Sequence, residues 1–371
     1  MDFSVYFFAA NDRYGFDERY HFILDVARFI DRHGFRAVWT PERHFQEFGG
    51  SFPNPSVLSA AVAAVTGQVE LRAGSVVLPH HHLVRVAEEW ALVDQLSGGR
   101  VGLCLATGWN KADFVFFPDR YDRRREYTLG QVATLRRLWR GEEVGFPGPG
   151  GRELVVRTYP RPRQPELPLW LVHTANPATW TAAAGLDLNV LTLLDSWDRL
   201  AGNIAAYRAA RAAAGLDPAA GVVTVGLHTY LGDDEAEVRE LVREPVRRYL
   251  DTFLQQKKSD ASVAGQSQPM SDAEQRTLSE LAAEDFYQRR SLLGTADKCA
   301  AVVDRLAGIG VDEIACLVDF GLPFPTVLDA LPRLDGLRRR YAPAPPAAEP
   351  VAARATEPVA ATGPVGWYYD R

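Results

Sequence analysis

Two side chains suited to acid–base chemistry, Glu42 and His44, follow an apolar run at 37–40, with Arg43 between them. A carboxylate beside an imidazole can take up and return a proton during catalysis, so the pair is a candidate acid–base site. The alternative is structural, because Glu42 could instead be neutralised by Arg43 or Arg85 at the rim of a barrel. The sequence leaves both interpretations open.

A second candidate site lies at Asn176-Pro177. Asn is a preferred N-cap and Pro a preferred first helical residue, so a helix is predicted to begin here with free backbone amides at its end. Such an end can bind a phosphate group, and the hydroxyls of Thr174 and Thr179 could add hydrogen-bond donors. Most capped helices bind nothing, so the motif alone is a weak indication of a phosphate site.

Three consecutive histidines, His80, His81 and His82, raise the question of a metal site. Consecutive residues at the end of a strand point in alternate directions, so the three side chains are not expected to converge on one ion. We therefore predict no metal site and expect one of these histidines to line a pocket. The chain has no Gly-x-Ser-x-Gly elbow, Walker loop or His-Glu-x-x-His motif, which disfavours hydrolases and nucleotide-hydrolysing enzymes.

The hydrophobic pattern predicts the elements that position these residues. Eight short apolar or β-branched runs alternate with amphipathic segments, which is typical of parallel α/β proteins. This number of units favours a (βα)8 TIM barrel over a doubly wound sheet, and no phosphate-binding glycine fingerprint follows the first run. The aromatics Phe7 and Trp109 are either core residues or flat walls for a planar ligand. The predicted strands cover 3–8, 37–40, 71–78, 101–106, 169–173, 188–193, 222–230 and 313–319.

Two longer segments, 142–165 and 246–293, interrupt the alternation. The first is rich in Gly and Pro and could form a hairpin, and the second is polar and helix-prone. We interpret both as insertions in the strand-to-helix loops of a barrel that spans 1–341. Residues 342–371 are rich in Ala and Pro and are predicted to form a disordered tail. The aromatic residues at 367–369 are either a docking peptide or incidental.

Composition excludes several classes of protein. The chain has 371 residues and a net charge of -6, which argues against a nucleic-acid partner. No apolar run reaches the roughly 18 residues of a membrane span, and Asp2 stands where a signal peptide would be basic, so a cytoplasmic protein is expected. The three cysteines, Cys104, Cys299 and Cys316, have neither metal-like spacing nor a disulfide framework and are expected to be reduced.

At the predicted strand ends the chain resembles the bacterial luciferase-like flavin monooxygenases. The resemblance covers roughly residues 1–340. It rests on Glu42-Arg43-His44-Phe45 followed by Pro53-Asn54-Pro55, on the run Asp94-Gln95-Leu96-Ser97-Gly98-Gly99-Arg100, and on Gly108-Trp109-Asn110. The segments 174–180 and 189–192 are similar to the branch that works with nonribosomal peptide and polyketide assembly lines.

The resemblance implies a barrel that uses O2 and FMN, with the FMN reduced by a separate flavin reductase. It implies that Glu42 lies near the flavin, with His44 and Arg43 as further catalytic candidates, and that a non-prolyl cis peptide at Gly74–Ser75 lies beneath the flavin ring. Arg43 stands where luciferase has a histidine, so light emission is not expected. The implied cofactor-binding residues are Gly74, Ser75, Thr107, Gly108, Trp109, Thr174, Ala175, Asn176 and Thr179.

The leading hypothesis is an FMN-dependent monooxygenase of natural-product biosynthesis that acts on a substrate bound to an acyl or peptidyl carrier protein. The alternatives are a deazaflavin-dependent dehydrogenase of the same fold and a catalytically silent flavin-binding protein. A homodimer is expected, because the predicted helices around 22–33 and 57–65 are apolar enough to pair. No nucleic-acid or membrane partner is expected.

Overall fold

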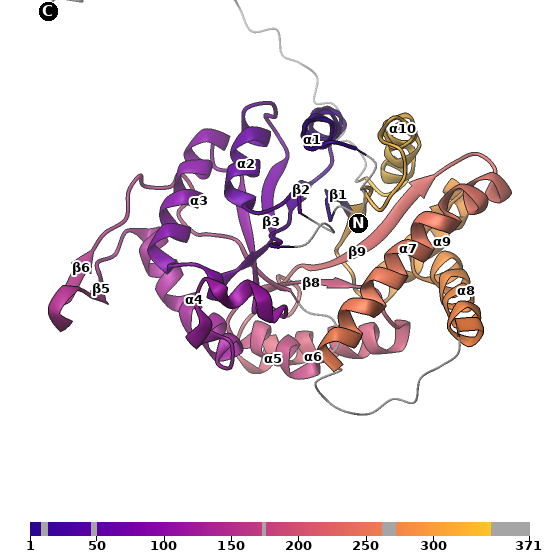
Figure 1. Ribbon diagram of the computed structural model, residues 1–371. Coiled ribbons are helices and arrows are strands. Elements are labelled where there is room, and N and C mark those ends of the chain that lie inside the picture. Colours follow the sequence, from indigo (N-terminus) through magenta and orange to yellow (C-terminus); the bar gives the residue numbers. More distant parts are fainter. Residues whose placement is uncertain (9–13, 46–49, 173–175, 262–271, 343–371) are drawn as a thin grey trace, which may run out of the picture. The chain divides into compact units, whose positions relative to one another are not determined.

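The computed structural model describes residues 1–8, 14–45, 50–172, 176–261 and 272–342, and only the backbone for 252–261 and 272–280. The chain divides into two units, Met1–Tyr341 and Ala342–Arg371. All described helices and strands belong to the first unit (Figure 1). The aromatic residues predicted as a docking peptide lie outside the described residues.

Parallel strands close into the predicted (βα)8 barrel (Figure 1). Each barrel strand pairs with the next barrel strand along the chain, and the ring closes where β11 pairs with β1. The eight predicted strands all form, with ends that differ by no more than a few residues from the prediction. In order around the ring they are β1 (Asp2–Tyr6), β2 (Ala37–Thr40), β3 (Glu70–Val77), β4 (Val101–Ala106), β7 (Leu169–Val172), β8 (Asn189–Leu193), β9 (Val223–Leu231) and β11 (Glu313–Leu317).

Helices surround the barrel, and local signals set their ends. The Asn54 side chain caps α2 (Pro55–Ala63) by accepting from the backbone N–H groups of Ser56 and Val57. At the other end of a helix, Gly98 adopts a φ of 79° directly after α3 (Leu83–Ser97), a conformation that glycine tolerates best. Further helices are α1 (Phe16–Arg32), α4 (Arg124–Arg140), α5 (Pro177–Gly185), α6 (Trp197–Ala213), α9 (Ala296–Gly308) and α10 (Phe324–Arg340).

Two separate cores stabilise this arrangement. The outer core lies between strands and helices and includes the buried residues Phe22, Val26 and Ile30 of α1. These apolar residues, in the helix that was expected to pair two copies of the chain, are therefore used inside the fold. The inner core fills the barrel, where Trp39 and Trp170 meet edge to face with ring centroids 5.4 Å apart.

The two insertions lie in different kinds of connection. The first contains the predicted hairpin, β5 (Val144–Pro147) paired with β6 (Glu153–Val156). It follows α4 and precedes β7, so it is a helix-to-strand connection and not the expected strand-to-helix loop. The second insertion follows β9 as expected. It comprises α7 (Glu235–Ala261), α8 (Asp272–Arg289) and β10 (Leu292–Gly294).

Two predictions from composition can be compared with the described part of the chain. No helix there is both long and apolar enough to cross a membrane. Cys104, Cys299 and Cys316 are all buried free thiols, as predicted. Burial raises the pKa of Cys316 to about 12, so this thiol is an unreactive core residue at neutral pH.

Asp31 of α1 fixes the turn that leads into β3. Its carboxylate accepts hydrogen bonds from the backbone N–H groups of Gly67, Gln68 and Val69 at 2.9, 2.7 and 2.9 Å. Burial alone would raise the pKa of Asp31, but the three hydrogen bonds outweigh it and hold the pKa below its ordinary value of 3.8. The ionised carboxylate therefore stabilises the fold.

The substitution Asp31→Asn should lower the free energy of unfolding by about 1–2 kcal/mol at neutral pH. Because the pKa is lower in the folded state, the advantage of the wild type is complete above the ordinary carboxyl pKa and disappears as pH falls through the folded value. Urea unfolding of both proteins from neutral pH down to about pH 3 measures this difference. A gap between them that does not shrink in acid would contradict the assignment.

Candidate active site

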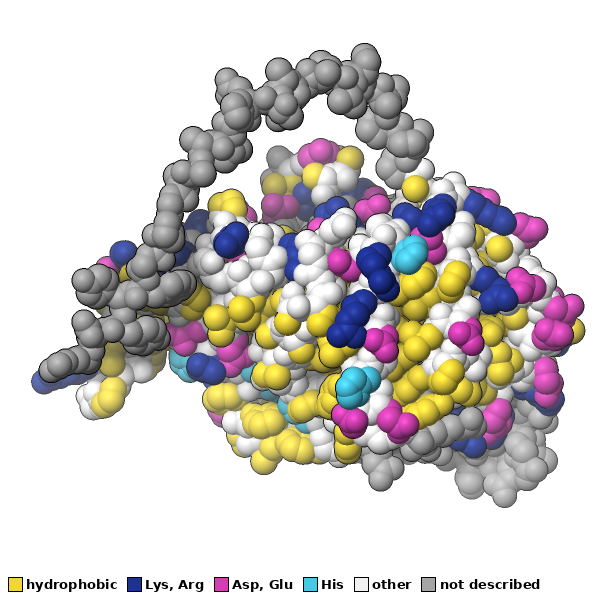
Figure 2. Space-filling view, turned by 90° about the horizontal axis from the view of Figure 1, so that it is seen from above, with side chains coloured by type: hydrophobic (Ala, Val, Ile, Leu, Met, Phe, Trp, Pro, Cys, Tyr) yellow, Lys and Arg dark blue, Asp and Glu magenta, His cyan; other side chains and the backbone are white. Residues whose placement is uncertain are grey.

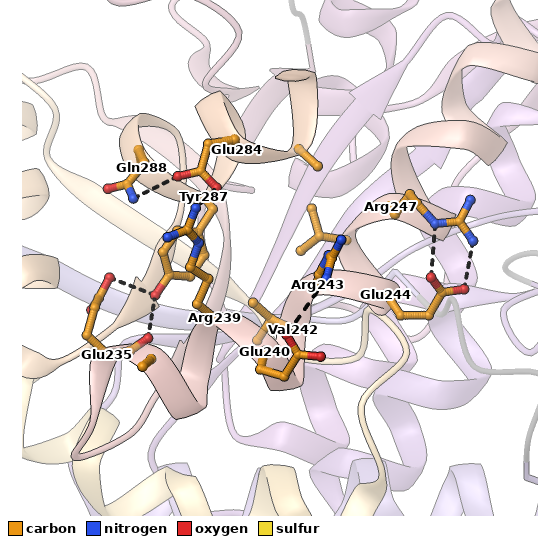
Figure 3. Close-up of a pocket in the computed structure, with 13 residues that line it drawn as sticks. Glu235, Arg239, Glu240, Val242, Arg243, Glu244, Arg247, Glu284, Tyr287 and Gln288 are labelled. Carbon is orange, nitrogen blue, oxygen red and sulfur yellow. Dashed lines mark hydrogen bonds and ion pairs between the residues drawn. The ribbon is translucent and has the colours of Figure 1, made fainter. Parts of the chain in front are cut away.

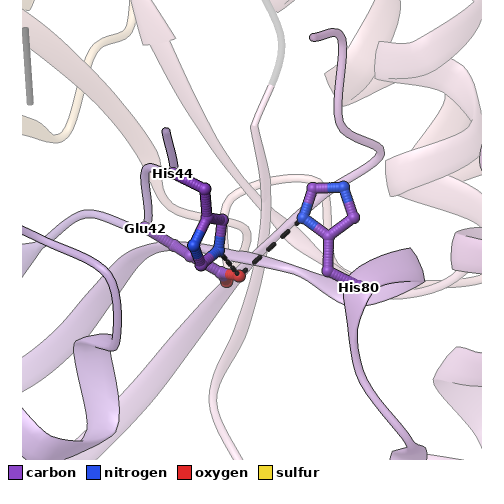
Figure 4. Close-up of side chains that lie close together, drawn as sticks. All are labelled: Glu42, His44 and His80. Atoms are coloured by element: carbon purple, nitrogen blue, oxygen red, sulfur yellow. Dashed lines mark hydrogen bonds and ion pairs between the residues drawn. The ribbon is translucent and has the colours of Figure 1, made fainter. Parts of the chain in front are cut away.

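The buried carboxylate of Glu42 lies at the carboxyl end of β2 and holds three groups together. His44 Nε2 and His81 Nε2 lie 2.9 and 2.8 Å from its Oε1, and the backbone N–H of Val77 donates to Oε2 at 2.8 Å. Figure 4 shows His44 and His80 both directed toward this carboxylate, with His80 Nδ1 at 3.9 Å. Glu42 thus joins the loops that follow β2 and β3.

Hydrogen bonds within this cluster shift the pKa values of Glu42 and His81. Burial alone would raise the pKa of Glu42, but the hydrogen bonds from His44, His81 and Val77 lower it to about 2. Burial disfavours the charged form of His81, yet its hydrogen bond to Glu42 raises the His81 pKa above its ordinary value. The carboxylate is therefore an anion at neutral pH, and the imidazoles beside it act as hydrogen-bond donors.

The three consecutive histidines do not alternate as predicted. Leu78–His80 forms a short 3-10 helix (η1), so the period-two geometry of a strand ends before His80. As a result His80 and His81 both approach Glu42, whereas the His82 ring caps α3 by accepting from the Val84 N–H at 3.3 Å. The prediction that the three side chains point in alternate directions was therefore wrong for His80 and His81.

Neither Arg43 nor Arg85 pairs with Glu42, so the salt bridge considered for this carboxylate does not form. Arg85 pairs with Glu89 on the surface of α3 at 2.8 Å. The guanidinium of Arg43 lies 4.3 Å from the centre of the Phe8 ring, and its charge interacts with Tyr249 and Asp319. Burial lowers the Arg43 pKa, but a guanidinium remains protonated at neutral pH. The barrel mouth thus holds a buried cation beside the anion of Glu42.

The predicted flavin platform on β3 has the expected backbone. The Gly74–Ser75 peptide bond is cis, as the resemblance implies. The Tyr6 hydroxyl donates to the Gly74 carbonyl at 2.5 Å, and a Cβ at position 74 would lie 2.9 Å from Tyr6 Cε2 and 3.2 Å from Trp39 Cβ. Only glycine fits there without displacing buried rings. Contact of Gly74 and Ser75 with a flavin remains a prediction.

The loop after β4 also depends on a glycine. Gly108 has a φ of 74°. A Cβ there would lie 2.9 Å from Cγ1 of Val77, the residue whose backbone N–H binds Glu42. The Thr107 hydroxyl is 3.5 Å from the Gly108 carbonyl oxygen. Trp109 is 44% exposed, so it is no core residue and its ring is accessible to a ligand, whereas Phe7 is fully buried against Phe22.

The helix start at Asn176 forms as predicted, and the structure adds a cation to it. The Asn176 side chain accepts from the Ala178 N–H at 3.0 Å, and the adjacent Thr179 is buried. Arg125, from the first turn of α4, donates to the Thr179 hydroxyl and to the Ala178 carbonyl oxygen. Sequence analysis did not predict Arg125 as a site residue. The only signal for it was the run of three arginines at 123–125, which follows the fourth strand. Thr174 and Ala175 lie outside the described residues.

The insertion after β9 supplies one wall of the barrel mouth. Tyr249 of α7 is buried against His228, with ring centroids 4.1 Å apart, and against Phe8 at 6.4 Å. His228 also meets Phe320 at 5.4 Å, and burial lowers the His228 pKa to about 3. These groups make a dry, mostly aromatic wall. Nothing in the pattern of α7 distinguished Tyr249 from other apolar positions.

A hollow of about 880 Å³ lies between α7 and α8 (Figure 3). None of its lining residues is a predicted site residue. Its charged side chains are paired with one another, as Arg247 with Glu244 at 2.8 Å and Arg239 with Glu284 at 2.7 Å. Chemistry is therefore better placed at the barrel mouth than in this salt-bridged hollow.

Comparison with known proteins agrees with the fold. A model of the luciferase-like monooxygenase family matches residues 1–313. The oxygenase component of a flavin-dependent trigonelline monooxygenase from Acinetobacter baylyi is 26% identical over 331 residues, which are 85% of this chain and 88% of that protein.

Two solved structures have similar folds. Monooxygenase RslO1 from Streptomyces bottropensis has a TM-score of 0.74 at 26% identity, covering 92% of this chain and 100% of that one. The oxygenating constituent of 3,6-diketocamphane monooxygenase from Pseudomonas putida, in complex with FMN, has a TM-score of 0.74 at 16% identity, covering 93% and 99%, and supports the fold alone. Because the family model spans most of the barrel, this chain belongs to the luciferase-like monooxygenase family.

Proposed function

We propose that this chain is the oxygenase component of a two-component monooxygenase. It takes reduced FMN from a separate flavin reductase and uses O2 to place one oxygen atom in an organic substrate. The observation that carries the proposal is the ionised, histidine-bound Glu42 at the mouth of a luciferase-like barrel. The relative from Acinetobacter baylyi, named as an oxygenase component, supports the two-component arrangement.

The residues present fit an FMN molecule at both of its ends. The amides at the start of α5 and the Arg125 guanidinium can bind the phosphate, together with Asn176 and Thr179. The backbone at Gly74–Ser75, which carries no Cβ at position 74, and the exposed Trp109 ring would hold the ring system, with Thr107 and Gly108 as further contacts. Thr174 and Ala175 are proposed as further phosphate contacts. Bound reduced FMN would supply the electrons that activate O2.

The protein side chains have three tasks in this proposal. His44, with a side chain 10% exposed, is the histidine through which the Glu42 cluster gives or takes a proton at a ligand. Arg43 stabilises negative charge that develops at the mouth. Phe8, Tyr249 and Phe320 exclude water, which protects a reactive oxygen species from unproductive decay.

Arg125 offers a direct test of the phosphate site. The substitution Arg125→Met should weaken FMN binding about 10-fold, because one charge-assisted contact is worth about 1.5–3 kcal/mol when buried and less when it is exposed. Quenching of FMN fluorescence measures the dissociation constant. Arg136→Met is the matched control, since Arg136 binds the carbonyl groups of Leu186 and Asp187 at the opposite end of α5. Equal weakening in both variants would contradict the assignment.

The reaction class is tested with the purified chain, a flavin reductase, NADH and FMN. Incorporation of one atom from ¹⁸O2 into a product would support the proposal. Binding of reduced FMN with release of hydrogen peroxide alone, across a broad substrate panel, would favour a catalytically silent flavin protein. Reduction of an added deazaflavin by an alcohol, without O2 uptake, would replace the proposal with the dehydrogenase alternative.

We further propose a natural-product substrate held on an acyl or peptidyl carrier protein, with 343–371 as the docking segment. This rests on the sequence resemblance to the assembly-line branch. A chain ending at residue 342 should process the free thioester normally and the carrier-bound form at least about 10-fold more slowly, because a docking segment raises the local concentration of its partner. Equal rates on the carrier-bound form would overturn the docking proposal.

A homodimer is also proposed, through α2 and α3 rather than α1. Val57, Leu92 and Leu96 are 67%, 52% and 59% exposed on these two adjacent helices. Figure 2 shows one face of the molecule, on which hydrophobic side chains gather in patches among basic and acidic ones. Light scattering should give twice the chain mass for the wild type, and Leu92→Glu should shift it toward the monomer.

A further inference from the structure

We propose that Glu42, His44 and His80 form a binding site for a divalent transition metal of the Zn²⁺ class. One ligand atom from each residue lies within 4.8 Å of the other two. Figure 4 shows the two imidazoles directed at the same carboxylate from separate loops. This inference goes beyond the proposed function. An ion bound to His44 Nε2 would occupy the nitrogen that carries the proton in the proposed function, so the two uses of the cluster exclude each other.

His80 is the residue whose surroundings indicate that an ion binds here. Its side chain is 1% exposed, and neither ring nitrogen has a hydrogen-bond partner among the described residues. A buried polar group without a partner costs about 1–3 kcal/mol, so native proteins rarely leave one unsatisfied. The ring is held in place edge to face against Phe114, with centroids 4.7 Å apart, which fixes Nδ1 on the side of Glu42.

The two distances from Glu42 to the histidine nitrogens come close to those around a small tetrahedral ion. Two ligands about 2.0–2.1 Å from one Zn²⁺ lie about 3.3 Å apart when the geometry is tetrahedral. Glu42 Oε1 lies 2.9 Å from His44 Nε2 and 3.9 Å from His80 Nδ1, so shifts of about half an ångström would bring both pairs to that spacing. Two imidazoles and one carboxylate are a known zinc ligand set that leaves a fourth position for water.

Metal binding displaces one proton from the cluster. The ion takes the place of the Nε2 proton that His44 donates to Glu42, and this proton passes to solvent. His81 would keep its hydrogen bond to Glu42 at 2.8 Å and orient the carboxylate from outside the metal's own ligands.

Metal binding is tested on the full-length chain without added flavin. Titration with Co²⁺, followed by its visible absorption, and with Zn²⁺, followed by calorimetry, should give one ion per chain with tetrahedral absorption bands. His80→Leu should weaken binding at least about 100-fold, since loss of a direct ligand exceeds the 10–100-fold cost of losing an outer partner. His44→Gln should weaken it comparably.

The matched control is His82→Asn, which removes the neighbouring histidine but retains a helix cap, and it should bind Zn²⁺ like the wild type. Circular dichroism confirms that each variant is folded. No stoichiometric binding by the wild type, or equal affinity in His80→Leu, would overturn the proposal. FMN binding is measured separately on the same proteins, so failure of the metal site leaves the proposed function untouched.

Discussion

Replacement of Glu42 by glutamine should lower the free energy of unfolding by about 2–4 kcal/mol and reduce oxygenase turnover at least about 100-fold. The carboxylate accepts hydrogen bonds from His44, His81 and the backbone N–H of Val77. A glutamine amide offers only one accepting oxygen and places an NH2 group against one of these donors. The loops after β2 and β3 would therefore lose the anion that joins them.

Urea unfolding measures the loss of stability, and oxygen uptake with reduced FMN measures turnover once a substrate is found. Glu88→Gln is the control, because Glu88 is a half-buried residue of α3 whose carboxylate makes one long ion pair with Arg85, at 3.8 Å. That substitution should change stability by less than about 0.5 kcal/mol. Equal effects of the two substitutions would show that Glu42 is a surface-like charge and would remove the central argument for the site.

The second large effect is expected inside the barrel, at the buried ion pair of Arg72 and Glu313. Both side chains are 2% exposed and 2.7 Å apart, and the guanidinium lies between the Trp39 and Trp170 rings. Ser4 also donates to Glu313 at 2.6 Å. Arg72→Met should lower the free energy of unfolding by about 3–5 kcal/mol, because it leaves Glu313 buried without its counter-charge. Glu313→Gln should cost less, since Arg72 keeps a second ion pair with Glu70 at 2.7 Å.

The double substitution distinguishes pairing from packing. Arg72→Met with Glu313→Gln should cost at least about 1 kcal/mol less than the sum of the single substitutions, since the second change removes an already unpaired group. The exposed pair Arg239 and Glu284, at 2.7 Å, is the control, and Arg239→Met should cost less than about 1 kcal/mol. Additive losses at Arg72 and Glu313 would mean that the charges do not act as a pair.

The periodicity of the sequence was enough to predict the barrel, because a parallel strand is a short local pattern bounded by turn and capping residues. Ala37–Thr40 and Val101–Ala106 form strands with the predicted ends. Asn176 begins a helix as predicted, because capping involves only the next few residues. The place of the first insertion was predicted wrongly, because the same Gly- and Pro-rich composition suits a loop at either end of a helix.

The sequence indicated some residues of the candidate site, and the tertiary structure was needed to find their partners. Glu42 and His44 stood out from their types and spacing alone. Their partners did not, since His81 lies 39 positions from Glu42, and Arg125 lies 54 positions from Thr179. Such contacts are set by how strand ends converge when the barrel closes, which no local pattern records. The short helix at Leu78–His80 likewise turned two adjacent histidines toward one carboxylate, because tertiary packing overrode the alternation of a strand.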